Sequence, residues 1–139
     1  MSESRKHMDL VQIVLDYAKS VIDTDLHGII QYDSPDTSRP PRLIDNYVPD
    51  VYFCYKDLLI IGEAKTLDDF ERVHSKKQFQ SYIKECAAFP GHSIIVIAVP
   101  WQLIHTAKNH FRRLKLDANI STKIVVINEL RSCFEIWVV

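Results

Sequence analysis

The spacing of apolar residues along the chain predicts three helices. Apolar positions recur every three or four residues over about 8–22, over about 71–88 and in a segment that follows Pro100. This spacing puts them on one face of a helix. The residues on the three apolar faces are Leu10, Ile13, Val14, Tyr17 and Val21; Phe79, Tyr82, Ile83, Cys86 and Ala87; and Ile104, Ala107, Phe111 and Leu114.

Short apolar runs between these helices predict strands. Two runs, near 50–55 and 58–65, are separated by Lys56 and Asp57, which predicts a hairpin. The run SIIVIAV over 93–99 is apolar throughout, which is typical of a strand buried on both faces. Further strands are predicted over 27–32, 123–128 and 134–139.

The order of these elements is helix, strand, hairpin, helix, strand, helix, strand, strand. Helices interleaved with strands predict an α/β or α+β fold, in which a central mixed sheet is flanked by helices. The chain has 139 residues, which is the size of one domain and enough to bury a core without disulfides. We therefore expect residues 1–139 to form a single domain.

Composition and charge narrow the function only slightly. The chain is 47% hydrophobic and 25% charged, with a net charge of -1, so a nucleic-acid partner would have to bind to a local basic patch. The three cysteines form no CxxC pair, which predicts neither a disulfide framework nor a zinc site. No apolar run is long enough for a membrane span, and we expect a cytoplasmic protein.

The register of the hairpin brings two acids together. If Lys56 and Asp57 form the turn, or if the loop is longer by one residue on each side, Asp50 lies opposite Glu63. Directly opposed side chains share a face of the sheet, with Cβ atoms about 4.5–5.5 Å apart. Lys65 lies two residues after Glu63 and therefore projects from the same face.

Neighbouring carboxylates repel each other, and burial makes the repulsion more costly. A cation between Asp50 and Glu63 would reverse the sign, and oxygen ligands of this kind, with the Ala64 carbonyl nearby, suit Mg²⁺ or Mn²⁺. The alternative is that these residues and Lys65 are solvated charges at strand ends, which contribute little to stability. Three features favour the metal site. The apolar run before Glu63 places it on a central strand, Gly62 permits another group to approach the backbone closely, and the register gathers the three charges.

The hairpin residues resemble a known motif. Pro49-Asp50 and, after twelve intervening residues, Glu63-Ala64-Lys65 are similar to the motif of the PD-(D/E)xK nuclease superfamily. In that family the motif lies on a hairpin of a mixed sheet, within the αβββαβ core of the restriction-endonuclease-like fold. The predicted order of elements over about 8–99 resembles that core.

A second match lies on the predicted helix over 71–88. Gln78 and Tyr82 are neighbours on the helix surface and resemble the Q-x-x-x-Y signature of some branches of the superfamily. The alternatives are a solvated Gln78 and a Tyr82 at the edge of the core. The chain departs from the family at the first helix, where many members carry a further metal-binding acid. None of the acids there is marked by its spacing; they are Asp9, Asp16, Asp23 and Asp25.

The resemblance implies a Mg²⁺-dependent nuclease that hydrolyses phosphodiester bonds of DNA, with Mn²⁺ as a substitute metal. It implies that Asp50, Glu63 and the Ala64 carbonyl hold the metal. Lys65 would orient the attacking water or stabilise the charge of the transition state. Gln78 would contact the phosphate or the nucleophile.

Basic residues near the motif are candidates for contacts to DNA phosphates. Together with Tyr82, the candidates are Lys76 and Lys77 on the second helix and Lys108, Arg112, Arg113 and Lys115 on the third. The alternative for the third helix is a solvated basic face. The segment 33–42, rich in Pro, Ser and Asp, predicts a loop that either closes over DNA through Arg39 and Arg42 or is a plain connection. His74 and His92 are candidates for proximity to the site without an assigned role.

Three functions remain open. The first is a DNA nuclease for duplex, single-stranded or branched substrates, with a homodimer or a larger nuclease complex as possible assemblies. The second is a catalytically inactive nucleic-acid-binding or assembly subunit with the same fold. The third is a structural domain in which the charges of the hairpin are incidental.

Overall fold

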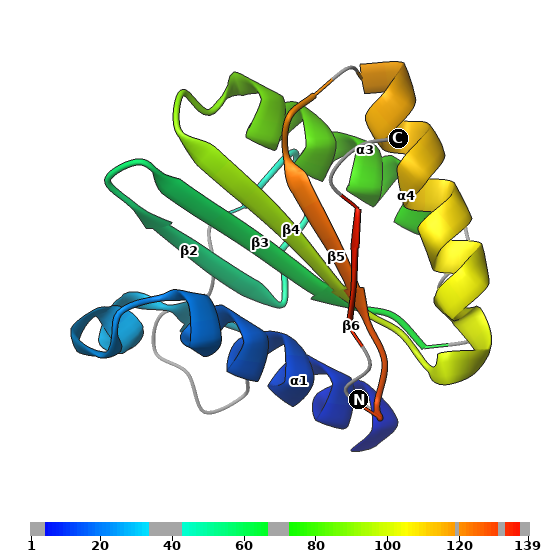
Figure 1. Ribbon diagram of the computed structural model, residues 1–139, viewed down its shortest axis with the longest axis horizontal. Coiled ribbons are helices and arrows are strands. Elements are labelled where there is room, and N and C mark those ends of the chain that lie inside the picture. The colour runs from blue at the N-terminus through cyan, green and yellow to red at the C-terminus, as the bar shows by residue number, and fades with distance from the viewer. Residues whose placement is uncertain (1–4, 34–42, 67–72, 119, 131–132, 137–139) are drawn as a thin grey trace.

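A six-stranded mixed sheet forms the centre of the protein (Figure 1). The computed structural model describes residues 5–33, 43–66, 73–118, 120–130 and 133–136. The strands lie side by side in chain order, with β3, β4 and β5 parallel and the other neighbours antiparallel. They are β1 (Gln31–Tyr32), β2 (Val51–Tyr55), β3 (Leu58–Ala64), β4 (His92–Ala98), β5 (Lys123–Ile127) and β6 (Cys133–Ile136).

Helices cover both faces of the sheet (Figure 1). Helix α1 (Arg5–Val21) lies on one face, and α3 (Val73–Ala88) and α4 (Ile104–Ala118) lie together on the other. The crossovers from β3 to β4 and from β4 to β5 step in the same direction across the sheet, and right-handed crossovers of this kind put their helices on the same face. The predicted α/β architecture, a mixed sheet between helices, is confirmed, and the order from α1 to β4 is αβββαβ once a short 3₁₀ helix is set aside.

Alternate residues of β3 pack into two separate core layers. Ile60 and Ala64 are buried in the layer under α1, whereas Leu59 and Ile61 are buried in the layer under α3 and α4. Because side chains of a strand alternate between faces, Glu63 lies on the same face as Leu59 and Ile61. The sheet therefore directs the Glu63 side chain toward α3 and not toward α1.

The predicted hairpin register is confirmed. The pairs run from Tyr55 opposite Leu58 to Val51 opposite Gly62, so the next position in the same register sets Asp50 beside Glu63. The turn is the two-residue one, and its first residue, Lys56, has a φ of 54°. The left-handed region is uncommon for lysine but is what a tight hairpin turn requires.

The predicted strand over 27–32 is wrong for most of its length. Residues Thr24–Ile29 form the 3₁₀ helix η1, and only Gln31–Tyr32 pair as a strand. The His27 Nε2 atom lies 2.9 Å from the carbonyl oxygens of both Lys19 and Ile22, at the end of α1. These contacts hold the chain against the helix end, and they outweigh the weak strand preference of a short segment.

The other elements lie close to their predicted positions. Helix α1 begins at Arg5, α4 is preceded by the 3₁₀ helix η2 (Trp101–Leu103), and Cys54 is exposed while Cys86 is buried. Two residues expected on apolar helix faces, Val21 and Ala87, are exposed. Predictions for 34–42, including Arg39 and Arg42, for 71–72 and for 137–139 lie outside the described residues. Within the described part of the chain, no helix is both long and apolar enough to cross a membrane.

Replacing Gly62 by alanine is expected to destabilise the fold. An added Cβ would collide with Val14 Cγ1 of α1 and would lie 3.2 Å from Val51 Cβ. Overpacking of this kind costs about 1–3 kcal/mol of unfolding free energy. Urea unfolding measures the effect. Gly28→Ala is the matched control, since nothing lies within 4 Å of its added Cβ. Equal stability of the two variants would contradict the close contact between α1 and β3.

Candidate functional site

Five polar side chains from three segments are buried together on the α3 side of the sheet. Asp50 comes directly before β2, Glu63 lies near the end of β3 and Lys65 directly after it, while Gln78 and Tyr82 come from α3. Each is at most 8% exposed. Burial of this many polar groups is favourable only if they bond to one another, and the hydrogen bonds show that they do.

Glu63 lies at the centre of the cluster. Its Oε2 atom accepts hydrogen bonds from the Asp50 backbone N–H at 3.2 Å and from the Tyr82 hydroxyl at 3.1 Å. Its Oε1 atom accepts one from Gln78 Nε2 at 3.1 Å and lies 3.7 Å from Lys65 Nζ. Both carboxyl oxygens of Glu63 are thus held by groups of the protein.

Asp50 is fixed by the other strand of the hairpin and by α1. Its Oδ2 atom accepts a hydrogen bond from the Ala64 N–H at 2.8 Å and lies 3.5 Å from His7 Nε2. Together with the bond from the Asp50 N–H to Glu63 Oε2, these contacts lock the two acidic residues against each other across the hairpin. The role of the Ala64 carbonyl as a metal ligand stays a prediction.

The electrostatics of the cluster make the ionised form of Glu63 costly. Burial raises the pKa of Glu63 well above its usual value and the Asp50 charge raises it further, while the Lys65 charge lowers it. Burial, followed by the charge of Glu63, also raises the pKa of Tyr82, so its hydroxyl remains a hydrogen-bond donor. An added positive charge beside these acids would favour their ionised forms.

The donor set fits a hard cation that keeps water ligands. Mg²⁺ is usually held by one or two carboxylates together with waters and substrate phosphates, and Asp50 and Glu63 supply the carboxylates. Among the described residues, none donates a hydrogen bond to the buried Gln78 Oε1 atom, and a metal-bound water would supply such a donor. In the same part of the chain no group of three or more His, Cys, Asp or Glu side chains is arranged to hold a metal.

The α1 residue that contacts Asp50 is His7, and this was not predicted. The four acids considered for the first helix lie as follows: Asp16 accepts a hydrogen bond from Gln12 Nε2 at 2.8 Å on the helix surface. Asp23 and Asp25 are exposed near η1, and Asp9 is exposed beside a pocket. The spacing carried a signal for His7, because the buried residues Val11 and Val14 continue its helix face.

The basic residues separate into exposed and buried ones. Lys76, Lys77, Arg112 and Arg113 are exposed, as expected for phosphate contacts. The prediction for Lys115 is wrong, because this residue is buried in the face of α4 that packs on the sheet.

Three histidines, His110, His92 and His74, differ in their relation to the site and to the basic residues. Burial lowers the pKa of His110, and the charges of Lys76 and Arg113 lower it further, so basic residues of α3 and α4 gather around it. His92 pairs with Leu58 at the opposite end of β3 from Glu63, so it does not lie near the site. The His74 side chain lies outside the described residues.

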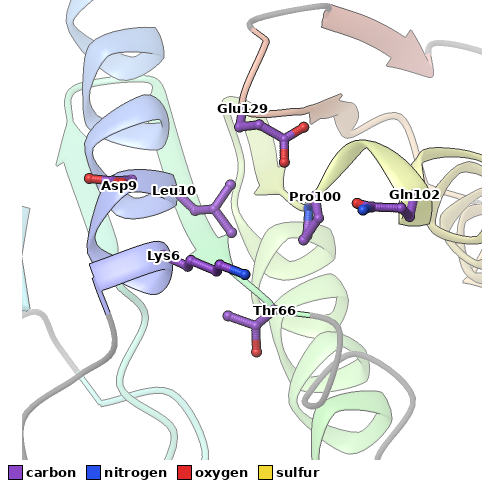
Figure 2. A pocket seen from close by; sticks show the side chains of 7 residues that line it. All are labelled: Lys6, Asp9, Leu10, Thr66, Pro100, Gln102 and Glu129. Carbon is purple, nitrogen blue, oxygen red and sulfur yellow. The ribbon is translucent and has the colours of Figure 1, made fainter.

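A pocket of about 390 Å³ has Thr66, the residue after Lys65, in its wall (Figure 2). It lies where the carboxyl ends of β3, β4 and β5 meet the first turns of α1, and ligands of open α/β sheets bind in such places. Its lining residues on α1 are Lys6, Asp9 and Leu10. Those that follow the three strands are Thr66, Pro100, Gln102 and Glu129. Sequence patterns did not indicate this pocket, because its residues come from four separate segments.

Comparisons of the chain with protein-family models, with curated proteins and with solved structures found no match.

The ionisation of Glu63 is expected to make stability depend on pH. Because the folded state keeps the Glu63 proton at pH values where the unfolded chain has lost it, the folded state binds more protons there. The free energy of unfolding then falls as the pH rises above about 4.3, by at most about 1.4 kcal/mol per pH unit. Glu63→Gln should remove this contribution in metal-free buffer, as measured by urea unfolding at a series of pH values.

The matched control is Asp117→Asn, which neutralises an exposed carboxyl group of α4 and should keep the wild-type pH dependence. A pH profile of Glu63→Gln that coincides with the wild-type profile would show that Glu63 is not a costly buried charge.

Proposed function

We propose that this protein is a nuclease that hydrolyses phosphodiester bonds of DNA with a divalent metal ion, in the manner of the PD-(D/E)xK superfamily. The observation that carries the proposal is the buried cluster of Asp50, Glu63 and Lys65 on one hairpin. A structural role alone gives no reason to bury two adjacent acids and a lysine, because a buried ion pair rarely adds stability over an apolar alternative.

Asp50 and Glu63 are the residues that would hold Mg²⁺ or Mn²⁺, with the Ala64 carbonyl as a further ligand. When bound, the ion would polarise phosphoryl oxygens and lower the pKa of a bound water. Without the ion the two carboxyl groups repel each other. This repulsion is the second cause of the raised pKa of Glu63, and burial is the first.

The other residues of the cluster would orient the attacking water, neutralise charge on the phosphate and hold Glu63 in position. Lys65 Nζ, 3.7 Å from Glu63 Oε1, is placed to orient a water molecule or to stabilise negative charge that develops on the phosphate. Gln78 Oε1 is free to accept a hydrogen bond from a nucleophilic water. Tyr82 holds Glu63 in position through its hydroxyl group. The close bonding of the cluster keeps these groups in a fixed geometry, as catalysis requires.

Basic residues of α3 and α4 would position the DNA backbone. Lys76, Lys77, Arg112 and Arg113 are exposed, and Lys76 and Arg113 both act on His110, so the two helices present one basic region. Contacts of this kind bind phosphates without reading sequence. A homodimer, or a larger nuclease complex, would bring a second strand within reach of a second site.

The second candidate is a catalytically inactive DNA-binding or assembly subunit. Two observations favour it: both oxygens of Glu63 already accept hydrogen bonds from the protein, and no group of three potential metal-ligand side chains was found among the described residues. In this alternative the cluster is retained as a rigid support, and the basic surface alone carries the function.

Cleavage of labelled oligonucleotides in Mg²⁺ or Mn²⁺ tests the first proposal. Glu63→Ala and Lys65→Ala should each lower the rate by at least about 100-fold, since each removes a group that stabilises charge at the reacting centre. Lys56→Ala is the matched control, because Lys56 is an exposed lysine at the turn end of the hairpin, and it should cleave like the wild type. Cleavage that survives both site substitutions would refute the assignment. Binding without cleavage in every form, weakened by salt, would favour the inactive subunit.

Titration calorimetry with Mn²⁺ tests the metal site independently of catalysis. In the presence of a phosphorothioate oligonucleotide, Asp50→Asn should weaken Mn²⁺ binding by at least about 10-fold, since the loss of even an indirect partner of a metal has effects of this size. Asp117→Asn removes an exposed carboxylate of α4 and should bind Mn²⁺ like the wild type. Equal affinities of the two variants would exclude Asp50 as a ligand.

A further inference from the structure

The pocket beside the cluster has no part in the chemistry described so far. Thr66 in its wall directly follows Lys65, and the Lys65 N–H donates to the Ala98 carbonyl at 3.0 Å, two residues before Pro100. Helix α1 supplies both His7, which contacts Asp50, and the pocket residues Lys6 and Leu10. Lys65 and Thr66 project from opposite faces of the sheet, but the pocket and the cluster share its carboxyl-terminal edge. A DNA strand that crossed this edge, with a phosphate at Glu63 and Lys65, would bring a nearby nucleotide to the pocket.

The lining suits a flat ligand with a polar edge. Leu10 and Pro100 present apolar surfaces, while Lys6, Gln102 and Glu129 bring polar groups to the rim (Figure 2). A nucleobase has this character, with two apolar faces and an edge of donors and acceptors. The volume of about 390 Å³ is in the range of small-ligand pockets, which is about 300–1,000 Å³.

We propose that this pocket binds one unpaired nucleobase of the DNA strand whose phosphate reaches the cluster. The inference rests on the proposed nuclease function and names its substrate: single-stranded DNA, or DNA unpaired next to the scissile phosphate. A base within a duplex has its edge paired and its faces stacked, so it enters a pocket only after it leaves the stack. Single-stranded DNA does not carry that cost.

An exposed tryptophan adds to the preference for unpaired DNA. Trp101 lies between the pocket residues Pro100 and Gln102 in the chain and is 59% exposed. Large aromatic surfaces in water are costly, and single-strand-binding proteins use such residues to stack bases. Because Trp101 is exposed and adjoins two pocket residues in the chain, it would stack a base next to the one in the pocket.

The acid of the pocket assigns a base preference. Glu129 Oε1 accepts a hydrogen bond from the Trp101 N–H at 2.8 Å, which fixes the carboxyl group, and Figure 2 shows this group close to Pro100 at the wall of the pocket. A carboxylate accepts from the exocyclic amine of cytosine, whereas thymine has a carbonyl at that position. The pocket should therefore favour cytosine over thymine.

Fluorescence anisotropy with labelled oligodeoxycytidine, oligothymidine and a duplex of equal length tests the proposal, with Ca²⁺ in place of Mg²⁺ to limit cleavage. The wild type should bind the cytidine strand about 5-fold or more tightly than the thymidine strand, as one lost base contact predicts, and should bind the duplex most weakly. Glu129→Gln keeps an acceptor for the Trp101 N–H and should abolish the difference between cytidine and thymidine. Gln102→Ala should weaken binding of both single strands but not of the duplex.

The control is Gln12→Ala, an exposed glutamine of α1 that is bonded to Asp16 outside the pocket; it should bind like the wild type. Unchanged discrimination in Glu129→Gln, or competition by free dCMP as strong as by the oligonucleotide, would overturn the proposal that the pocket binds a base of the DNA strand.

Parallel cleavage assays separate the pocket proposal from the proposed nuclease function. Cleavage with no effect of the pocket variants refutes the pocket alone, and altered discrimination without any cleavage supports the pocket while the nuclease function fails.

Discussion

The antiparallel pairing of β2 with β3 is the constraint on which the site depends. With Tyr55 opposite Leu58 and Val51 opposite Gly62, the two acids at the open end of the hairpin come together on one face. A slip of one residue would turn Glu63 toward α1 and away from Gln78 and Tyr82. The apolar residues of β3, which alternate between two core layers, make such a slip costly, so the same packing that stabilises the sheet also sets the register of the charged residues.

The cluster shows how a fold tolerates buried charge at a candidate functional site. Glu63 accepts hydrogen bonds from a backbone N–H, a hydroxyl group and an amide, and it has a lysine nearby. These partners lower the cost of burial without removing it, as the raised pKa of Glu63 shows. A buried polar cluster of this kind is less stable than an apolar core would be, and the proposed metal ion would recover part of that difference.

Features that depend on residues close together in the chain could be predicted from the sequence, whereas features that depend on contacts between elements could not. The hairpin register followed from two apolar runs of matched length around Lys56 and Asp57, because pairing of adjacent strands is a local property. The 3₁₀ helix η1 did not follow, since it depends on the contacts of His27 with the end of α1. For His7 the sequence carried half of the information: its helix face continues through the buried residues Val11 and Val14, but its place beside Asp50 depends on how α1 lies across the sheet.

The pocket could not be predicted from the sequence. Its walls come from the start of α1 and from the segments after three different strands, and no spacing rule connects residues so far apart in the chain. The sequence also failed to show that Lys115 is buried. Its neighbours Arg112 and Arg113 are exposed, but its place on the face of α4 toward the sheet buries it. Position on a helix face, and not charge, decided which basic residues reach the surface.

The hydrogen bonds of Glu63, Asp50, Gln78 and Tyr82 have a consequence for folding. Those between segments span only 13 to 19 positions in the chain, and the strands on either side of β3 are its neighbours in chain order. The entropy lost on closing short loops is small, and contacts between segments close in sequence form quickly. The contacts of the cluster therefore need only the hairpin and α3, and we expect them to form without β5 and β6. The contact of His7 with Asp50 joins residues much further apart in the chain and so closes a longer loop.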